Sequence, residues 1–201
     1  MLLLVLGLGV GGGLGYYVAP PKIVERQVSV GVEVSRPAPQ FSLASTMNRQ
    51  VSLAECRGKW LILFFFPAAY TPICQSEVQE FSRRLGEFKK LNTEVVAASV
   101  DNVTILRKWS AELGGIQYPI LSDAGGIVSQ RYGSYTQAST QQLIKGKAVS
   151  MRGTYIIDPE GILRYSLVHD ELVGRSVQET IRVLEALQSG GACLIEWRPK
   201  E

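Results

Sequence analysis

The sequence predicts a layered α/β domain in which helices flank a mixed β-sheet. Through the first two thirds of the chain, apolar runs rich in β-branched residues alternate with segments of helical period, as in parallel strands joined by helices. Nearer the C-terminus, apolar runs at 153–158 and 162–168 flank the Pro- and Gly-containing turn 158–161, which predicts an antiparallel hairpin. A sheet that contains both kinds of pairing is mixed.

The expected elements of the first half begin with a small hairpin. Short alternating runs at 41–43 and 51–53 predict two strands paired around Asn48. Residues 60–66 form the strongest predicted strand, which stops at a proline. A helix is expected over 72–90, because its apolar positions are spaced three and four residues apart: Val78, Phe81, Leu85 and Phe88.

The second half continues the alternation of strands and helices. We expect a buried strand at 94–100, a helix at 104–113 that ends at a glycine pair, and a short strand at 118–121. A short helix at 127–132 precedes the hairpin, and a helix at 176–188 follows it. The 201 residues therefore accommodate one domain with an ample core and an appendage.

Composition excludes several classes of protein. The 21 basic and 18 acidic residues are interspersed and give a net charge of only +3, so we expect no nucleic-acid partner. The three cysteines, Cys56, Cys74 and Cys193, are too few and too widely spaced for a disulfide-stapled module. With one histidine and no C-x-x-C pair, neither a metal site nor a cofactor is expected.

The N-terminus suggests an appendage to the domain. Residues 1–21 carry no charge, and a helix over residues 2–19 would be roughly 27 Å long, close to a bilayer core. We therefore predict an apolar N-terminal segment at 1–21, a linker at 22–32 and the domain at 33–201. A membrane anchor competes with a signal peptide, which would lack its basic n-region. The G-x-G-x-x-G pattern at 7–12 is not interpreted as a nucleotide loop, because two prolines interrupt the helix that should follow.

The expected localisation follows from the charges that flank this segment. Lys22 and Arg26 come after it, and no basic residue comes before it. The positive-inside tendency would place an anchored domain on the cytoplasmic side of the membrane. The alternative is a soluble cytoplasmic protein.

Cys74 is the leading candidate for a reactive residue. Thr71 is a favoured helix N-cap and Pro72 is tolerated at the first helical position, which makes Cys74 the third helical residue. Its sulfur would then face free backbone N–H groups and the positive end of the helix dipole. This environment favours the thiolate, which is the nucleophilic form of cysteine.

The spacing Pro67-x-x-x-Thr71-x-x-Cys74 resembles the active-site motif of peroxiredoxins. The tail at 193–199 is similar to the resolving-cysteine segment of the typical 2-Cys subgroup, which includes the alkyl hydroperoxide reductases and thiol-specific antioxidant proteins. The resemblance covers about residues 33–199. Further segments resemble the family in the same order: 36–41, 57–60, 118–123, 151–158 and 173–176.

This resemblance implies a thioredoxin-like fold and a thiol peroxidase that reduces hydrogen peroxide and organic hydroperoxides. Cys74 would be the peroxidatic cysteine, which is oxidised to a sulfenic acid. Thr71 would contact the peroxide, Pro67 would shield the sulfur, and Arg152 would lie beside the thiolate. From the residues alone, these three could instead be an N-cap, a strand terminator and a surface arginine. Glu77 is expected to orient Arg152.

The resemblance also implies a second cysteine and several partners. Cys193 would resolve the sulfenic acid to an intersubunit disulfide, which requires at least a homodimer and leaves a decamer open. Thioredoxin or a dedicated flavoprotein would reduce that disulfide. Leu194 departs from the proline that is usual after this cysteine, and Cys56 matches no functional cysteine of the family.

Two other functions remain open from the sequence. A redox-regulated holdase chaperone or a peroxide-signalling relay would use the same cysteines. A membrane-tethered thiol–disulfide oxidoreductase is disfavoured, because the chain lacks a C-x-x-C pair.

Overall fold

A computed structural model describes residues 31–193 and 197–198. The predicted apolar segment at 1–21, with its membrane anchor, and nearly all of the linker lie outside the described residues. Within the described part of the chain, no helix has the length and apolar character needed to cross a membrane.

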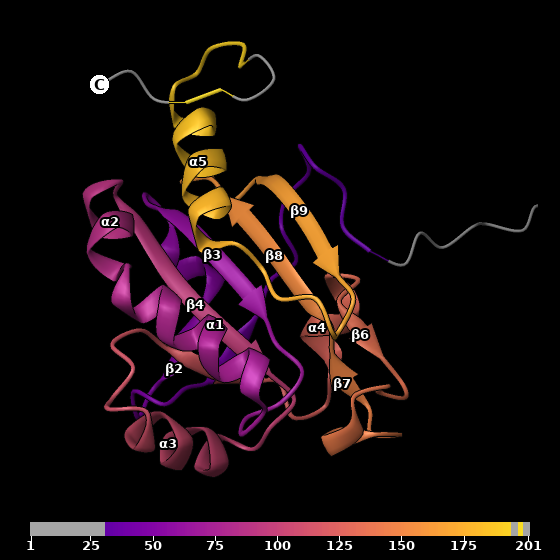
Figure 1. Ribbon diagram of the computed structural model, residues 1–201. Coiled ribbons are helices and arrows are strands. Elements are labelled where there is room, and N and C mark those ends of the chain that lie inside the picture. Colours follow the sequence, from indigo (N-terminus) through magenta and orange to yellow (C-terminus); the bar gives the residue numbers. More distant parts are fainter. Residues whose placement is uncertain (1–30, 194–196, 199–201) are drawn as a thin grey trace, which may run out of the picture.

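The centre of the domain is a five-stranded mixed sheet with the strand order β5-β4-β3-β8-β9 (Figure 1). The central strand, β3, pairs in parallel with β4 and antiparallel with β8. The sheet is therefore mixed, as the sequence predicts. The strands span Trp60–Phe65 (β3), Thr93–Ser99 (β4), Ile120–Ser122 (β5), Arg152–Ile157 (β8) and Leu163–His169 (β9).

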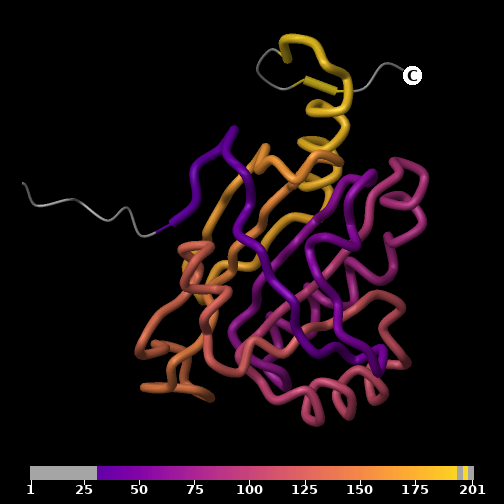
Figure 2. The backbone as a smooth tube through the Cα atoms, turned by 180° about the vertical axis from the view of Figure 1, so that it is seen from behind, coloured from indigo at the N-terminus to yellow at the C-terminus, as the bar shows by residue number. Residues whose placement is uncertain are grey.

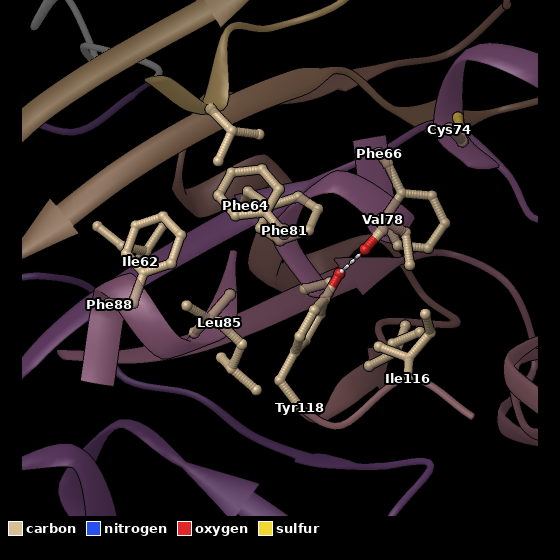
Figure 3. Packing of buried hydrophobic residues seen from close by; sticks show 14 of the residues in the cluster. Ile62, Phe64, Phe66, Cys74, Val78, Phe81, Leu85, Phe88, Ile116 and Tyr118 are labelled. Carbon is tan, nitrogen blue, oxygen red and sulfur yellow. Dashed lines mark hydrogen bonds between the residues drawn. The ribbon is translucent and has the colours of Figure 1, made fainter. Parts of the chain in front are cut away.

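Strand β3 is buried on both faces, so its alternate side chains belong to two different cores. Ile62 and Phe64 pack with helices on the face that is turned toward the viewer in Figure 1. These helices are α1 (Pro72–Arg83), α2 (Leu85–Lys90), α3 (Val103–Glu112) and α5 (Val177–Gln188). Figure 3 shows this core, in which the rings of Phe64 and Phe81 stack 4.2 Å apart. The apolar face of α1 thus anchors the helix that carries Cys74.

The opposite face of the sheet is covered by the first described residues of the chain, which cross it in Figure 2. Leu61, Leu63 and Phe65 pack there among residues of the N-terminal hairpin and α4. The hairpin strands pair antiparallel, and Asn48 adopts a left-handed φ of 56° in their turn. The elements on this face span Ser42–Ala44 (β1), Gln50–Ser52 (β2), Leu53–Cys56 (η1) and Ile127–Arg131 (α4).

The structure corrects the predicted helix at 72–90, which is two helices broken at Arg84. The apolar period continues through the break, because Phe81, Leu85 and Phe88 are all buried in the same core. At Arg84 the backbone leaves helical geometry, with ψ at 9°, and the weak helix former Gly86 follows closely. Hydrophobic spacing alone cannot detect such a one-residue interruption.

Two short strands were also not predicted. β6 (Tyr135–Thr136) and β7 (Val149–Ser150) pair antiparallel and enclose a 3-10 turn, η2 (Gln142–Ile144). Strands of two residues are too short to show an alternating pattern. They matter for the site, because β7 leads directly into β8 and Arg152.

Candidate active site

The loop between β3 and α1 is held by hydrogen bonds from Ala69 and Thr71. The backbone N–H of Ala69 donates to the Asp101 carboxylate at 2.8 Å, and Tyr70 adopts a left-handed φ of 61°. Thr71 then begins α1 as its N-cap residue. Its hydroxyl does not cap the helix but donates to the Ala68 carbonyl at 3.0 Å. The loop therefore presents the first turn of α1 in a defined orientation.

Cys74 is the third residue of α1, as predicted, and its side chain is fully buried. Pro67 is also buried, where the chain leaves β3. The sequence suggested backbone N–H groups as neighbours of the sulfur. The hydrogen bond that the structure gives to Cys74 Sγ comes instead from a side chain, Arg152, whose Nη1 lies 3.4 Å away.

Arg152 reaches Cys74 because of the antiparallel pairing of β8 with β3. Phe64, near the end of β3, is paired with Thr154, so the start of β8 lies beside the end of β3 from which α1 follows. Arg152 is fully buried, which excludes the surface role that an arginine before a strand usually has. Its Nη2 has no hydrogen-bond partner among the described residues.

Glu77 lies one helical turn after Cys74 and joins two buried guanidinium groups. Its Oε2 accepts from Arg152 Nη1 at 2.6 Å. Its Oε1 accepts from both the backbone N–H and Nε of Arg175, each at 3.0 Å. The predicted link between Glu77 and Arg152 is thus present in the structure, and Glu77 has a second cationic partner.

Arg175 was not predicted as a site residue, although it lies in the segment 173–176 that supported the family resemblance. Its guanidinium donates to the carbonyls of Gly153 and Phe65 at 3.1 and 2.5 Å, and lies 4.9 Å from the ring centroid of Phe64. Burial lowers the pKa of Arg175, and the Glu77 carboxylate opposes that shift. The sequence shows Arg175 only as an arginine close to the start of a helix. Arginines in such positions are common on protein surfaces, so this feature did not identify Arg175 as a site residue.

Cys193 is exposed and lies beyond the end of α5. In Figures 1 and 2 this end of the molecule is remote from the first turn of α1. Its sulfur donates to the Ala186 carbonyl at 3.6 Å, within its own end of the chain. The structure therefore brings together Thr71, Cys74, Glu77 and Arg152, but not Cys193.

Cys56 belongs to the opposite core, in η1. Burial, together with the charges of Glu94 and Glu55, raises its pKa to about 11. An unfolded thiol ionises near pH 8.5. The stability that the protonated thiol contributes is therefore complete below about pH 8.5 and is lost as the pH rises toward 11.

We expect the stability advantage of the wild type over Cys56→Ala to shrink by on the order of 2 kcal/mol between pH 8 and pH 11. Urea unfolding of both proteins at several pH values measures this difference. An advantage that stays constant with pH would show that the thiol ionises alike in the folded and unfolded chains.

The site consists of a buried thiol at the start of a helix, in contact with a buried guanidinium. The helix packs on a mixed sheet that other helices also flank. These features are typical of a thiol-dependent redox enzyme of thioredoxin-like fold. The described residues contain no group of three or more His, Cys, Asp or Glu side chains suited to holding a metal ion.

Comparison with known proteins agrees with this class. Residues 34–166 match the AhpC/TSA family, and the chain belongs to that family of peroxiredoxins. It is 41% identical over 175 residues to a peroxiredoxin assigned to a rubredoxin operon of Clostridium pasteurianum, which covers 82% of this chain and 94% of the relative. It is 39% identical over 181 residues to the mitochondrial thioredoxin-dependent peroxide reductase of Drosophila melanogaster, with 84% and 74% covered.

Solved structures show the same fold. The reduced 2-Cys peroxiredoxin of Plasmodium vivax superposes with a TM-score of 0.72 at 28% identity, over 83% of this chain and 90% of that one. A cysteine-to-serine mutant of peroxiredoxin 6 from Arenicola marina gives a TM-score of 0.78 at 25% identity, with 85% and 82% covered. The chain is therefore a peroxidase of the peroxiredoxin family with the predicted thioredoxin-like fold.

Proposed function

We propose that Cys74 reduces hydrogen peroxide and organic hydroperoxides by nucleophilic attack. The observation that carries this proposal is the contact between Cys74 Sγ and Arg152 Nη1. The thiolate sulfur attacks one peroxide oxygen, forming an S–O bond while the O–O bond breaks. The leaving oxygen takes the bonding electron pair and a proton and departs as water or an alcohol, which leaves Cys74 as a sulfenic acid.

The surrounding charges suit this step. The ion-paired group of Arg152, Arg175 and Glu77 carries two positive charges and one negative charge. A thiolate at Cys74 would balance it. During attack, negative charge moves from the sulfur to the leaving oxygen, and the unpartnered Nη2 of Arg152 is a donor already in place to stabilise it.

Thr71 and Pro67 complete the proposed site. Because the Thr71 hydroxyl donates its hydrogen to Ala68, its oxygen is left to accept a hydrogen bond from a protonated peroxide oxygen. The buried Pro67 at the end of β3 would help to keep water from the sulfur. Both groups would position the substrate rather than change covalently.

We further propose that Cys193 of a partner subunit resolves the sulfenic acid. Its thiolate attacks the Cys74 sulfur, and the S–O bond breaks as the disulfide forms. The leaving hydroxide takes up a proton and departs as water. The burial of Cys74 and the remote, exposed location of Cys193 favour a reaction between chains, with the first turn of α1 opening locally. A homodimer is the smallest assembly that permits it. A dithiol reductant would then restore both thiols, and the similarity to the Drosophila thioredoxin-dependent peroxide reductase supports thioredoxin over a flavoprotein.

The Cys193→Ser variant tests the resolving step. We expect it to reduce about one equivalent of peroxide per Cys74 and then to stop in the presence of thioredoxin and its reductase, because no disulfide forms. Peroxide-treated wild type should migrate as a disulfide-linked dimer in non-reducing electrophoresis, and the variant as a monomer. Normal thioredoxin-coupled cycling by the variant would remove the two-cysteine assignment.

A further inference from the structure

The residues that join β6 to β7 form a compact loop at 137–148. The backbone N–H of Ser139 donates to the Lys147 carbonyl at 2.8 Å, and that of Gly146 donates to the Ser139 carbonyl at 2.9 Å. These two hydrogen bonds close the base of the loop. A group that binds the base of the loop can therefore help to set the position of the loop.

The 137–148 loop packs against the loop before α1. Ile144 and Val149 form a small buried cluster with Ala68. The carbonyl of Ala68 is the group that accepts the Thr71 hydroxyl. A displacement of the 137–148 loop would therefore shift Ala68 and its hydrogen bond to Thr71, three residues before Cys74.

A single buried carboxylate, that of Glu171, holds the base of this loop. It accepts a short hydrogen bond from the Ser139 hydroxyl, one from the Thr140 backbone N–H at 3.3 Å, and one from Gln141 Nε2 at 3.4 Å. Among the described residues, no lysine or arginine nitrogen lies within 4.0 Å of it. A buried carboxylate without a cation is costly to desolvate, and these three hydrogen bonds offset part of that cost.

The same residue also holds Arg152. The main-chain carbonyl of Glu171 accepts from Arg152 Nε at 2.7 Å, while Glu77 accepts from Nη1 at 2.6 Å. These two acceptors fix the plane of the guanidinium, with Nη1 directed at Cys74 and Nη2 left free. If the Glu171 carbonyl moved, the guanidinium would turn about its contact with Glu77, and both donors would shift.

We propose that Glu171 is a positioning residue of the peroxidase reaction. Its carboxylate holds the 137–148 loop while its carbonyl holds Arg152, so that the loop and the guanidinium adopt their places together. This inference rests on the proposed role of Arg152 beside Cys74. Glu171 itself touches no reacting atom.

The test compares Glu171→Gln with Glu171→Leu. The amide of glutamine keeps the side-chain volume and one oxygen acceptor, but its NH₂ group replaces the second acceptor oxygen with a donor. Leucine removes both side-chain acceptors and leaves the main-chain carbonyl in place. Stopped-flow reaction with hydrogen peroxide across pH 5 to 9 should show a rate constant reduced about tenfold for Glu171→Gln and by up to about a hundredfold for Glu171→Leu. The midpoint of the pH profile should move upward. Glu160→Gln, in the exposed turn after β8, should behave as the wild type.

A double-mutant cycle separates positioning from general loss of structure. In an Arg152→Ala background, Glu171→Gln should slow the reaction by less than about twofold, because its effect acts through the missing guanidinium. The same tenfold loss in both backgrounds, or no loss in either, would overturn the inference. If Arg152→Ala itself reacts as fast as the wild type, the proposed role of Arg152 fails instead.

Discussion

Replacing Cys74 with serine is expected to reduce peroxide consumption by on the order of 10⁴-fold or more, to the background level. The serine hydroxyl stays protonated at neutral pH and cannot supply the thiolate that attacks the O–O bond. The other two cysteines cannot substitute for it. Cys56 lies in the opposite core with a pKa of about 11, and Cys193 lies beyond the end of α5. Thioredoxin-coupled peroxide consumption measures the loss.

Cys56→Ala is the matched control for this experiment, because it removes a buried thiol without touching the candidate site. It should retain the wild-type rate, although its stability should be lower. Peroxide consumption by Cys74→Ser above the background rate would show that another group performs the chemistry. Loss of activity in both variants would instead indicate that either substitution disturbs folding, which circular dichroism would detect.

The start of α1 could be predicted from the sequence because it depends on near neighbours. The proline at the first helical position, Thr71 before it and Cys74 two residues later are all local features. The same is true of the strand β3 and of the hairpin β8–β9, whose apolar runs and turn are contiguous. Local physical chemistry therefore located the proposed nucleophile and its helix.

The side chains around Cys74 could not be derived in this way. Arg152 is 78 residues from Cys74, and Arg175 is 98 residues from Glu77. Only the antiparallel pairing of β8 with β3 brings the first of these arginines to the end of β3. The family resemblance supplied Arg152, but no local pattern in the sequence distinguished the side chain of Arg175 or of Glu171 from that of an ordinary surface residue.

These long-range contacts place three charged side chains together in the interior of the site, an arrangement that cannot be seen from any one of these residues alone. One carboxylate, Glu77, stands between two guanidinium groups, and all three side chains are at most 3% exposed. Each charge would be costly to bury alone, and each is stabilised by the others. The cation that contacts the sulfur is therefore held in place by the same helix that carries the sulfur.

Glu77→Gln is consequently expected to lower the free energy of unfolding by about 3–5 kcal/mol, because it leaves two buried guanidinium groups without their anion. Arg152 and Arg175 would then repel one another, and Arg152 would lose the partner that directs its Nη1 at Cys74. We expect the rate constant with peroxide to fall by about tenfold or more in the variant that remains folded. Urea unfolding and stopped-flow kinetics measure the two effects separately.

Glu80→Gln, on the same helix, provides the comparison. Glu80 also pairs with an arginine, Arg83, but there the arginine side chain is 70% exposed and the glutamate 38%. An exposed pair of this kind contributes less than about 1 kcal/mol, because water and salt screen it. The same chemical change on one helix should therefore cost several times more at Glu77 than at Glu80. Equal stabilities of the two variants would contradict the view that Glu77 holds the buried charges of the site together.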